Sequence, residues 1–297
     1  MESLKQILSP DFLLRNSVYT SLIIGFACPL VGVFLVLRRL VFMGVALPQI
    51  SSTGIAVALT VPFWLGANPA HAEHSEHLIA FGGSMFFSLA AILLLAFFER
   101  RGRGLPEGRL GAAYVVASAL SILLLSKNHY AEVGWLDLLK GEIITIDNYD
   151  LITTGITLAI VLSVLMLFSK EFLLVSFDRA MAATLGKRVL FWDILIYLLI
   201  GVTVSIAVLS VGPLIAFAFL LVPALIAHLF ARNMRQFFAF ASVVGSVSAF
   251  VGFWLAYQWD WPVGPTDVVL LGMIYGFGSI GRKILLPASK SGHGNFG

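Results

Sequence analysis

The chain has 297 residues, of which 59% are hydrophobic and only 12% are charged. Soluble globular domains carry about 25% charged residues, so the chain lacks the polar groups that cover a water-exposed surface. The composition excludes an ordinary soluble enzyme and a disordered protein. The net charge of +3 comes from scattered basic residues, which excludes a nucleic-acid-binding protein. The remaining class is a protein that crosses the lipid bilayer several times.

Long apolar runs predict the membrane spans, because a helix that crosses the hydrocarbon core needs about 20 mostly apolar residues. They predict an all-α transmembrane bundle of about nine spans, with eight to ten as the range, at 17–37, 45–66, 79–98, 112–126, 151–169, 189–211, 213–231, 237–257 and 266–286. The run 189–231 is too long for one crossing. Gly212 and Pro213 supply the break, because proline removes a helix hydrogen bond and glycine permits a reversal. Gly272 and Gly276, four residues apart, would let another helix approach the last span closely; we expect this to be ordinary packing inside the bundle.

The distribution of basic residues predicts the orientation of the bundle. If 38–44 is cytoplasmic and the loops alternate, fifteen of the 19 Lys and Arg residues fall on the cytoplasmic side, as the positive-inside rule requires. This places the N-terminus outside and the C-terminus in the cytoplasm. No loop is long enough to fold alone, so we expect residues 1–297 to form one transmembrane domain with a flexible tail at 289–297.

The chain lacks the motifs of catalysis. It has no phosphate-binding loop and no hydrolase or metalloprotease signature, so we expect no ATPase activity of its own, no other enzymatic activity and no permanently bound cofactor. Apart from Arg282 and Lys283 at the cytoplasmic end of the last span, the ionisable residues within the predicted spans are Asp193, His228 and Asp267. Proton- and sodium-coupled carriers usually place carboxylates near the midplane. The sequence therefore favours a transport bundle that a partner subunit drives.

The loop after the second span contains three histidines and two glutamates, His71, Glu73, His74, Glu76 and His77. Imidazole and carboxylate are ligands that divalent zinc accepts where thiols are absent. These residues are candidates for capturing a metal ion at the outer face. The alternative is a polar loop that happens to be rich in histidine.

The segment 170–188 lies between two spans on the predicted cytoplasmic side. Its sequence predicts a short helix over 176–186, which Ser176 or Asp178 caps and Gly186 ends. Such a helix can dock a soluble partner and transmit its motion to the flanking spans. The alternative is a simple interfacial linker. A chain without its own energy source favours docking.

Four motifs, at Leu138 and Gly141, at 177–186, at 211–227 and at 262–270, carry a resemblance that extends from about residue 15 to 285: the chain resembles the permease subunits of ABC importers for zinc, manganese and iron. The 170–188 segment carries the pattern F-D-x-x-x-A-x-x-L-G at Phe177, Asp178, Ala182, Leu185 and Gly186. The other motifs lie at 211–227, at 262–270, and at Leu138 and Gly141. The hinge and packing positions among them are Gly212, Pro213, Pro223, Gly264 and Pro265.

The resemblance implies a mechanism and a set of partners. Two permeases, identical or paralogous, would form the pathway in a prokaryotic cytoplasmic membrane. A cytoplasmic ATP-binding-cassette ATPase would bind the 170–188 segment and drive alternating access. A separate solute-binding protein would deliver a divalent metal, the expected substrate, to the outer face.

One motif departs from the family. Its second span usually opens with G-D-x-x-x-H, which places Asp and His on one face of a helix. Here Val45 and Gln49 occupy those two positions. Valine cannot bind a metal, and an amide is a poor replacement for imidazole, so Gln49, Ser51, Ser52 and Thr53 are left as candidates for a polar path. The substrate alternatives are a metal chelate or another small solute; an ion-coupled carrier and a structural membrane protein are further alternatives.

Overall fold

The computed structural model describes residues 14–64, 73–100, 106–126 and 146–285. In these ranges the chain forms helices joined by turns, without a strand. The helices are α2 (Arg15–Leu37), α3 (Val41–Trp64), α4 (Glu73–Arg100), α5 (Pro106–Leu125), α7 (Asn148–Leu167), α8 (Ser169–Phe177), α9 (Arg179–Thr184), α10 (Val189–Phe230), α11 (Met234–Trp259) and α12 (Val263–Leu285). The predicted all-α class is confirmed for the described residues.

Each predicted span falls on one of these helices. Within the described ranges, α2, α3, α7, α10, α11 and α12 are long and apolar enough to cross a membrane. The third and fourth predicted spans correspond to α4 and α5, whose apolar stretches Leu78–Leu94 and Gly108–Leu124 are shorter. The count of nine spans and the orientation of the termini stay predictions.

The helix α10 is broken near its middle. It contains 42 residues, which at 1.5 Å per residue gives a length of about 63 Å, twice the hydrocarbon thickness of about 30 Å. Gly212 has φ 82° and ψ 166°, and it is the non-helical residue inside α10. A side chain would strain this backbone conformation, whereas glycine adopts it readily. The break lies where the sequence predicts it.

The contacts of the two halves of α10 show that the chain turns back at Gly212. The starts of α2 and α7 are joined by a side-chain hydrogen bond. Near the start of the first half of α10, Asp193 lies beside the opposite end of α2. Near the end of this half, Ser210 is hydrogen-bonded to Thr154, close to the start of α7. In the second half, Ala224 packs with Val33, again near the end of α2. The two halves therefore cover the two predicted spans.

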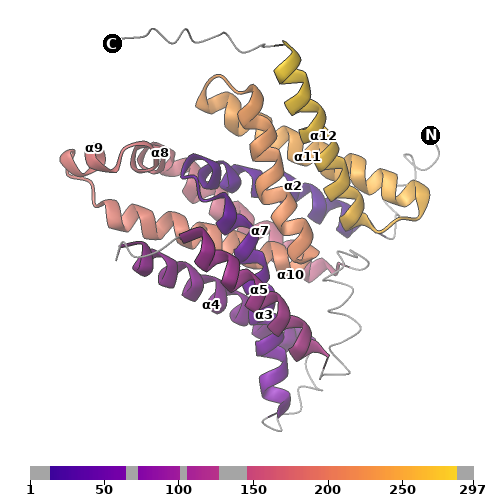
Figure 1. The fold of residues 1–297 in the computed structure, drawn as a ribbon. Coiled ribbons are helices and arrows are strands. Elements are labelled where there is room, and N and C mark those ends of the chain that lie inside the picture. Colours follow the sequence, from indigo (N-terminus) through magenta and orange to yellow (C-terminus); the bar gives the residue numbers. More distant parts are fainter. Residues whose placement is uncertain (1–13, 65–72, 101–105, 127–145, 286–297) are drawn as a thin grey trace, which may run out of the picture.

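The bundle is held together by close helix crossings. The helix α2 packs against α7, α10 and α11, and α3 packs against α4, α5 and α10 (Figure 1). Gly25 of α2 faces Gly245 of α11, and Gly54 of α3 faces Gly83 of α4. In each pair a Cβ atom would overlap the carbonyl group of the other glycine. Small residues let helix backbones approach this closely, which favours packing between helices in a membrane.

The outer faces of α5, α7 and α12 carry large apolar side chains. Val116, Leu167 and Phe277 are 64%, 74% and 74% exposed, which suits contact with lipid tails and not with water. The expectation that Gly272 and Gly276 pack inside the bundle is wrong. No atom lies within 4 Å of a Cβ built on either glycine, because α12 stands at the side of the bundle and packs against α10 and α11.

Candidate functional site

The face of α3 that begins with Val45 and Gln49 is partly open. Both residues are half-buried, whereas Ala46, Leu47 and Pro48 between them are buried. Residues four apart share one face of a helix. The face therefore presents an isopropyl group and a neutral amide, with no charged ligand from these two positions.

A cluster of buried hydroxyl groups lies further along α3 and on the helices that pack against it. We call it the hydroxyl cluster, and it consists of Ser51 and Thr53 of α3, Ser84 and Ser88 of α4, Ser121 of α5 and Ser205 of α10.

The hydroxyl cluster joins four helices. Ser51 shares a hydrogen bond with Ser84, and the Oγ1 atom of Thr53 lies 2.9 Å from the Oγ atom of Ser121. Ser205 donates to Ser88 over 3.2 Å. A buried hydroxyl needs such a partner, because desolvating it without one is costly.

The hydroxyl cluster explains the position of the other candidate path residues. Ser51, Ser52 and Thr53 are 0%, 6% and 3% exposed, so they face neighbouring helices. Of the five residues predicted to line a path, Val45 and Gln49 reach a partly open face.

The described residues contain no group of three or more His, Cys, Asp and Glu side chains that could hold a metal ion. Asp267 of α12 is fully buried, and neither carboxylate oxygen has a hydrogen-bond partner among these residues. Its Oδ1 atom fills the space that a Cβ atom on Gly252 would occupy. The glycine thus makes room for the carboxylate between α11 and α12.

The histidine-rich stretch lies partly within a helix. His71 lies outside the described residues, whereas Glu73, His74, Glu76 and His77 belong to the first two turns of α4. The expectation of a loop is therefore wrong for these four residues. The polar side chains begin the helix that carries the third predicted span. Their side chains lie outside the description, and metal capture stays a prediction.

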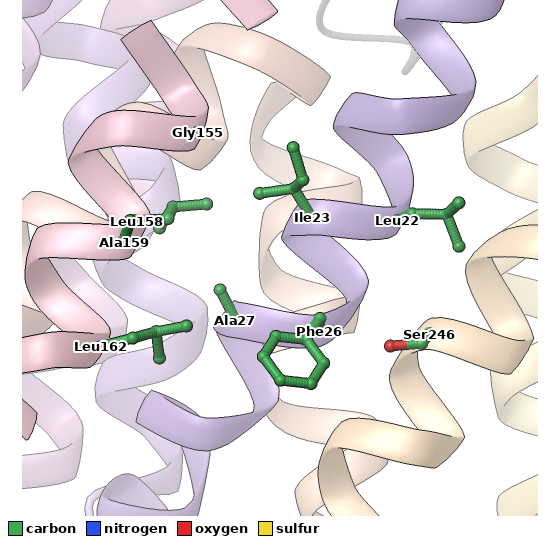
Figure 2. Close-up of a pocket in the computed structure, with 9 residues that line it drawn as sticks. All are labelled: Leu22, Ile23, Phe26, Ala27, Gly155, Leu158, Ala159, Leu162 and Ser246. Atoms are coloured by element: carbon green, nitrogen blue, oxygen red, sulfur yellow. The ribbon is translucent and has the colours of Figure 1, made fainter. Parts of the chain in front are cut away.

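An apolar cavity of about 460 Å³ lies between α2, α7 and α11. Figure 2 shows α2 in its centre, with Leu158 and Leu162 of α7 on one side and Ser246 of α11 on the other. Ser246 supplies its hydroxyl, and the remaining lining side chains are hydrocarbon. Such a cavity offers nothing to replace the water around a metal ion.

The 170–188 segment forms two short helices, α8 and α9. Asp178 separates them and caps α9, and its carboxylate accepts a hydrogen bond of 2.9 Å from the backbone N–H of Met181. Ser176 does not cap; its hydroxyl donates to the carbonyl of Phe172. Gly186 ends the segment with φ 73°, which glycine adopts without strain. The helix α9 covers 179–184, so the observed helix is shorter than the predicted helix over 176–186.

The exposed side of this segment is apolar. Phe177, Met181 and Leu185 are 65%, 54% and 58% exposed. Phe177 ends α8, whereas Met181 and Leu185 lie four residues apart on α9 and at its end, so these two share one side. We call these three exposed residues the apolar stripe. Ala182 is fully buried and faces the bundle. The motif residues thus divide into an exposed apolar stripe and a packed small residue.

A charged cluster that sequence reasoning missed lies beside this segment. We call it the Arg38 cluster: Arg38 at the end of α2, Ser176 of α8, Arg179 of α9 and Asp193 of α10. Nη1 of Arg38 lies 2.7 Å from Oδ1 of Asp193, and its Nε donates to Ser176 over 2.9 Å. Arg179 lies 3.6 Å from Oδ2 of Asp193. One feature of the sequence could have predicted the cluster: Arg38 and Asp193 carry opposite charges and lie at the same predicted end of their two spans.

The predicted hinge and packing positions lie at helix breaks and starts. Gly212 and Pro213 mark the break in α10, and Pro223 lies buried in its second half. Gly264 and Pro265 lie in the first turn of α12, where the missing N–H of proline removes no helix hydrogen bond.

The amino-acid sequence matches the model of a known protein family. The ABC 3 transport family matches residues 11–281, which is nearly the whole chain. The chain belongs to the ABC 3 transport family. Membership decides against an ion-coupled carrier and a structural membrane protein, and it confirms the resemblance to ABC permeases.

Curated relatives of this ABC 3 chain are named as metal transport proteins. The manganese transport system membrane protein MntC of Listeria monocytogenes is 28% identical over 262 residues, which cover 88% of each chain. A probable iron transport system membrane protein of Haemophilus influenzae is 26% identical, with 93% of this chain and 92% of the relative covered.

Solved structures have the same fold. PsaBC from Streptococcus pneumoniae in complex with Fab has a TM-score of 0.78 at 23% identity, covering 93% of this chain and 94% of that chain. A putative metal-chelate type ABC transporter in an inward-facing conformation has a TM-score of 0.68 at 19% identity, covering 97% of this chain and 91% of that chain. These similarities place α2 to α12 in an ABC permease fold.

Proposed function

We propose that the protein is the membrane permease subunit of a prokaryotic ABC importer for a divalent metal, with manganese or iron favoured over zinc. The observation that carries the proposal is the alignment over 88% of the chain with relatives named for manganese transport, within a family match to residues 11–281. We infer that it acts in the cytoplasmic membrane as one of two permeases, identical or paralogous, with a cytoplasmic ATPase and an extracytoplasmic binding protein.

The exposed stripe of Phe177, Met181 and Leu185 supports docking of the ATPase. Burying a large apolar side chain contributes about 1.5–3 kcal/mol, so the three together supply a strong apolar contact. The Asp178 cap and the turn at Gly186 set the start and the end of α9, which carries Met181 of this stripe. We infer that this end of the bundle faces the cytoplasm.

The neutral face at Val45 and Gln49 supports passage without tight binding. A site with an Asp and a His would hold a divalent cation by charge and imidazole coordination, whereas this face offers one amide oxygen. We infer that selectivity comes from the binding protein and that the membrane path holds the ion weakly. Residues 71–77 would act as a capture site before this path.

The same observation favours a second candidate, an importer for a chelated metal or another small solute. A chelated metal keeps its own ligands and needs no Asp or His from the path. The apolar Val45 beside Gln49 suits a larger, partly organic solute better than it suits a hydrated ion.

Reconstitution in lipid with the ATPase and the binding protein tests the proposal. We expect manganese or iron loaded on the binding protein to raise ATP hydrolysis and to accumulate inside the vesicles. Zinc-loaded binding protein serves as the comparison metal. ATP hydrolysis that responds to none of the metals, but does respond to a chelate, would favour the second candidate.

A pair of substitutions tests the path itself. Val45→Asp with Gln49→His installs the family's ligands one helical turn apart, and we expect measurable manganese binding by the purified permease. The wild type should bind manganese at least tenfold more weakly, since a ligand set of one amide lacks both charge and imidazole. Equal binding by both chains would contradict a weak site at this face.

A further inference from the structure

The helix α9 has little apolar attachment to the bundle. Of its six residues, Ala182 is the buried one. A polar pocket of about 330 Å³ lies beside α9, and Arg38, Ser176, Arg179 and Tyr197 are among the residues that line it. A short helix over such a pocket has room to shift against the bundle.

The neighbouring helix α8 is attached much more firmly. Phe172 is fully buried, and its ring packs edge-on against Phe34 of α2 and Trp192 of α10. Asp178, between α8 and α9, has an extended backbone. A force on α9 therefore bends the chain at Asp178, and it reaches the bundle through the contacts that α9 makes itself.

The Arg38 cluster supplies a contact of this kind. Asp193 shares its two oxygens between a buried arginine of α2 at 2.7 Å and an arginine of α9 at 3.6 Å. The side chains of Arg38 and Asp193 are 4% and 16% exposed, whereas that of Arg179 is 53% exposed. The buried contact is short and the exposed contact is long, so a displacement of α9 changes the second pair first.

Arg38 sits where α2 passes into α3. Arg39 ends α2 with φ 58°, and α3 begins at Val41. At 1.5 Å per residue, Val45 and Gln49 lie about 6 Å and 12 Å along α3 from its first residue. A rotation of the α2–α3 turn therefore acts directly on the face that carries these residues.

We propose that Arg38 is a positioning residue, and that Asp193 links it to Arg179 so that movement of α9 reaches the α2–α3 turn and the Val45–Gln49 face. This inference rests on the proposed docking of an ATPase to the 170–188 segment. Asp193 is common to both ion pairs. When α9 moves so that Asp193 binds Arg179 more closely, the ion pair with Arg38 weakens. When α9 moves away, the ion pair with Arg38 strengthens. Two discrete pairings of one carboxylate provide the two arrangements that coupling needs.

The test measures substrate transported per ATP hydrolysed in the reconstituted complex. Arg179→Gln removes the exposed partner and leaves the buried pair intact, so the variant should fold as the wild type does. We expect transport per ATP to fall by about two- to thirtyfold, the range for substitutions along coupling networks. Arg235→Gln, which removes an exposed arginine at the start of α11, is the charge-matched control and should leave the ratio unchanged.

A double variant separates coupling from a structural role. If Arg179 acts through Asp193, Arg179→Gln combined with Asp193→Asn should lower transport per ATP no further than Asp193→Asn alone. Arg38→Lys keeps the charge and should recover more of the ratio than Arg38→Gln does. Additive losses, or an unchanged ratio in Arg179→Gln, would overturn the proposal.

The wild-type complex distinguishes this inference from the proposed function. If wild type and ATPase do not assemble, or if they assemble without ATP-driven transport, the proposed function fails and the inference fails with it. If the wild type transports and Arg179→Gln transports with the same ratio, the inference alone fails.

Discussion

The hydroxyl cluster and the Arg38 cluster are two polar regions of one apolar bundle, and they differ in charge and place. The first joins α3, α4, α5 and α10 through neutral hydroxyl groups that are nearly all buried. The second joins α2, α8, α9 and α10 at the end where the 170–188 segment lies, and it carries two arginines and an aspartate. The hydroxyl cluster is neutral and buried, whereas the Arg38 cluster places its charges where the chain bends and turns.

The difference follows from the cost of desolvation. A hydrogen bond between neutral groups contributes about 0.5–1.5 kcal/mol, so replacing it changes little. Burying an ion costs several kcal/mol, and a partner and further hydrogen bonds must offset that cost. An ion pair placed at the end of the bundle can be remade when water or a partner protein approaches, whereas hydroxyl contacts hold a fixed packing. We therefore expect the Arg38 cluster to respond to movement and the hydroxyl cluster to resist it.

The largest expected effect on stability comes from breaking the buried ion pair. Arg38→Gln leaves the carboxylate of Asp193 with the distant Arg179, and we expect a loss of about 3–5 kcal/mol, the usual cost of removing one partner of a buried pair. Thermal unfolding of the purified permease in detergent measures it. Replacing both residues, as Arg38→Met with Asp193→Leu, should recover most of the loss. A single variant as stable as the wild type would show that water already reaches the pair.

A smaller effect is expected at the crossing of α3 and α4, beside the hydroxyl cluster. In Gly83→Ala the new Cβ would overlap the Cβ of Ala58 and the carbonyl group of Gly54. Overpacking of this kind costs about 1–3 kcal/mol, which the same unfolding assay would detect. Gly82→Ala is the matched control, because no atom lies within 4 Å of its new Cβ. Equal stability of the two variants would mean that the crossing yields easily.

The smallest effect is expected inside the hydroxyl cluster. Thr53→Val keeps the shape of the side chain and removes its contacts with Ser121 and with the carbonyl oxygen of Ala117. We expect a loss of about 0.5–1.5 kcal/mol, as for one ordinary hydrogen bond. Ser163→Ala, whose hydroxyl bonds within its own helix at an exposed site, should change stability less. If Thr53→Val cost as much as Arg38→Gln, the contrast between the two clusters would be lost.

An independent substitution sharpens the docking side of the comparison. Phe177→Ala removes an exposed phenyl group from the apolar stripe, and we expect the ATPase to bind about 10- to 150-fold more weakly, as the loss of about 1.5–3 kcal/mol of apolar burial implies. The affinity is measured by copurification: increasing amounts of the detergent-solubilised permease are added to the ATPase, and the bound ATPase is quantified. Phe230→Ala removes a phenyl group of 49% exposure at the end of α10 and should leave binding unchanged.

Much of the fold could be predicted from the sequence because its signals are local. Helix position follows from the mean hydropathy of a run, the break at Gly212 follows from adjacent glycine and proline, and the end of α9 follows from Gly186. The start of α9 was predicted less well, since Ser176 and Asp178 were equivalent candidates until the neighbours of each were known. Ser176 bonds with Arg38 and with its own helix, which leaves Asp178 as the cap.

The candidate site could be predicted only in part. The sequence identifies Val45 and Gln49 as the departure from the family pattern, and one helical turn places them on one face. It does not show that Ser51 and Thr53 turn toward α4 and α5, because a hydroxyl that lines a path and one that packs between helices have the same composition. The prediction for Gly272 and Gly276 was wrong because the spacing of two glycines does not show whether a neighbouring helix of the bundle lies against them.

The sequence by itself determined that this protein is a helical membrane bundle of the ABC permease type, with a break at Gly212 and a short helix in the 170–188 segment. Hydropathy and turn residues influence the backbone only over one or two helical turns, so their effects can be predicted segment by segment along the chain. Only the tertiary structure decided that Arg38 meets Asp193, 155 residues away, and that Thr53 meets Ser121, 68 residues away. Such pairs depend on how each helix is rotated about its axis and on the angles at which the helices cross. Rotation and crossing angles are set by the packing of many side chains at once.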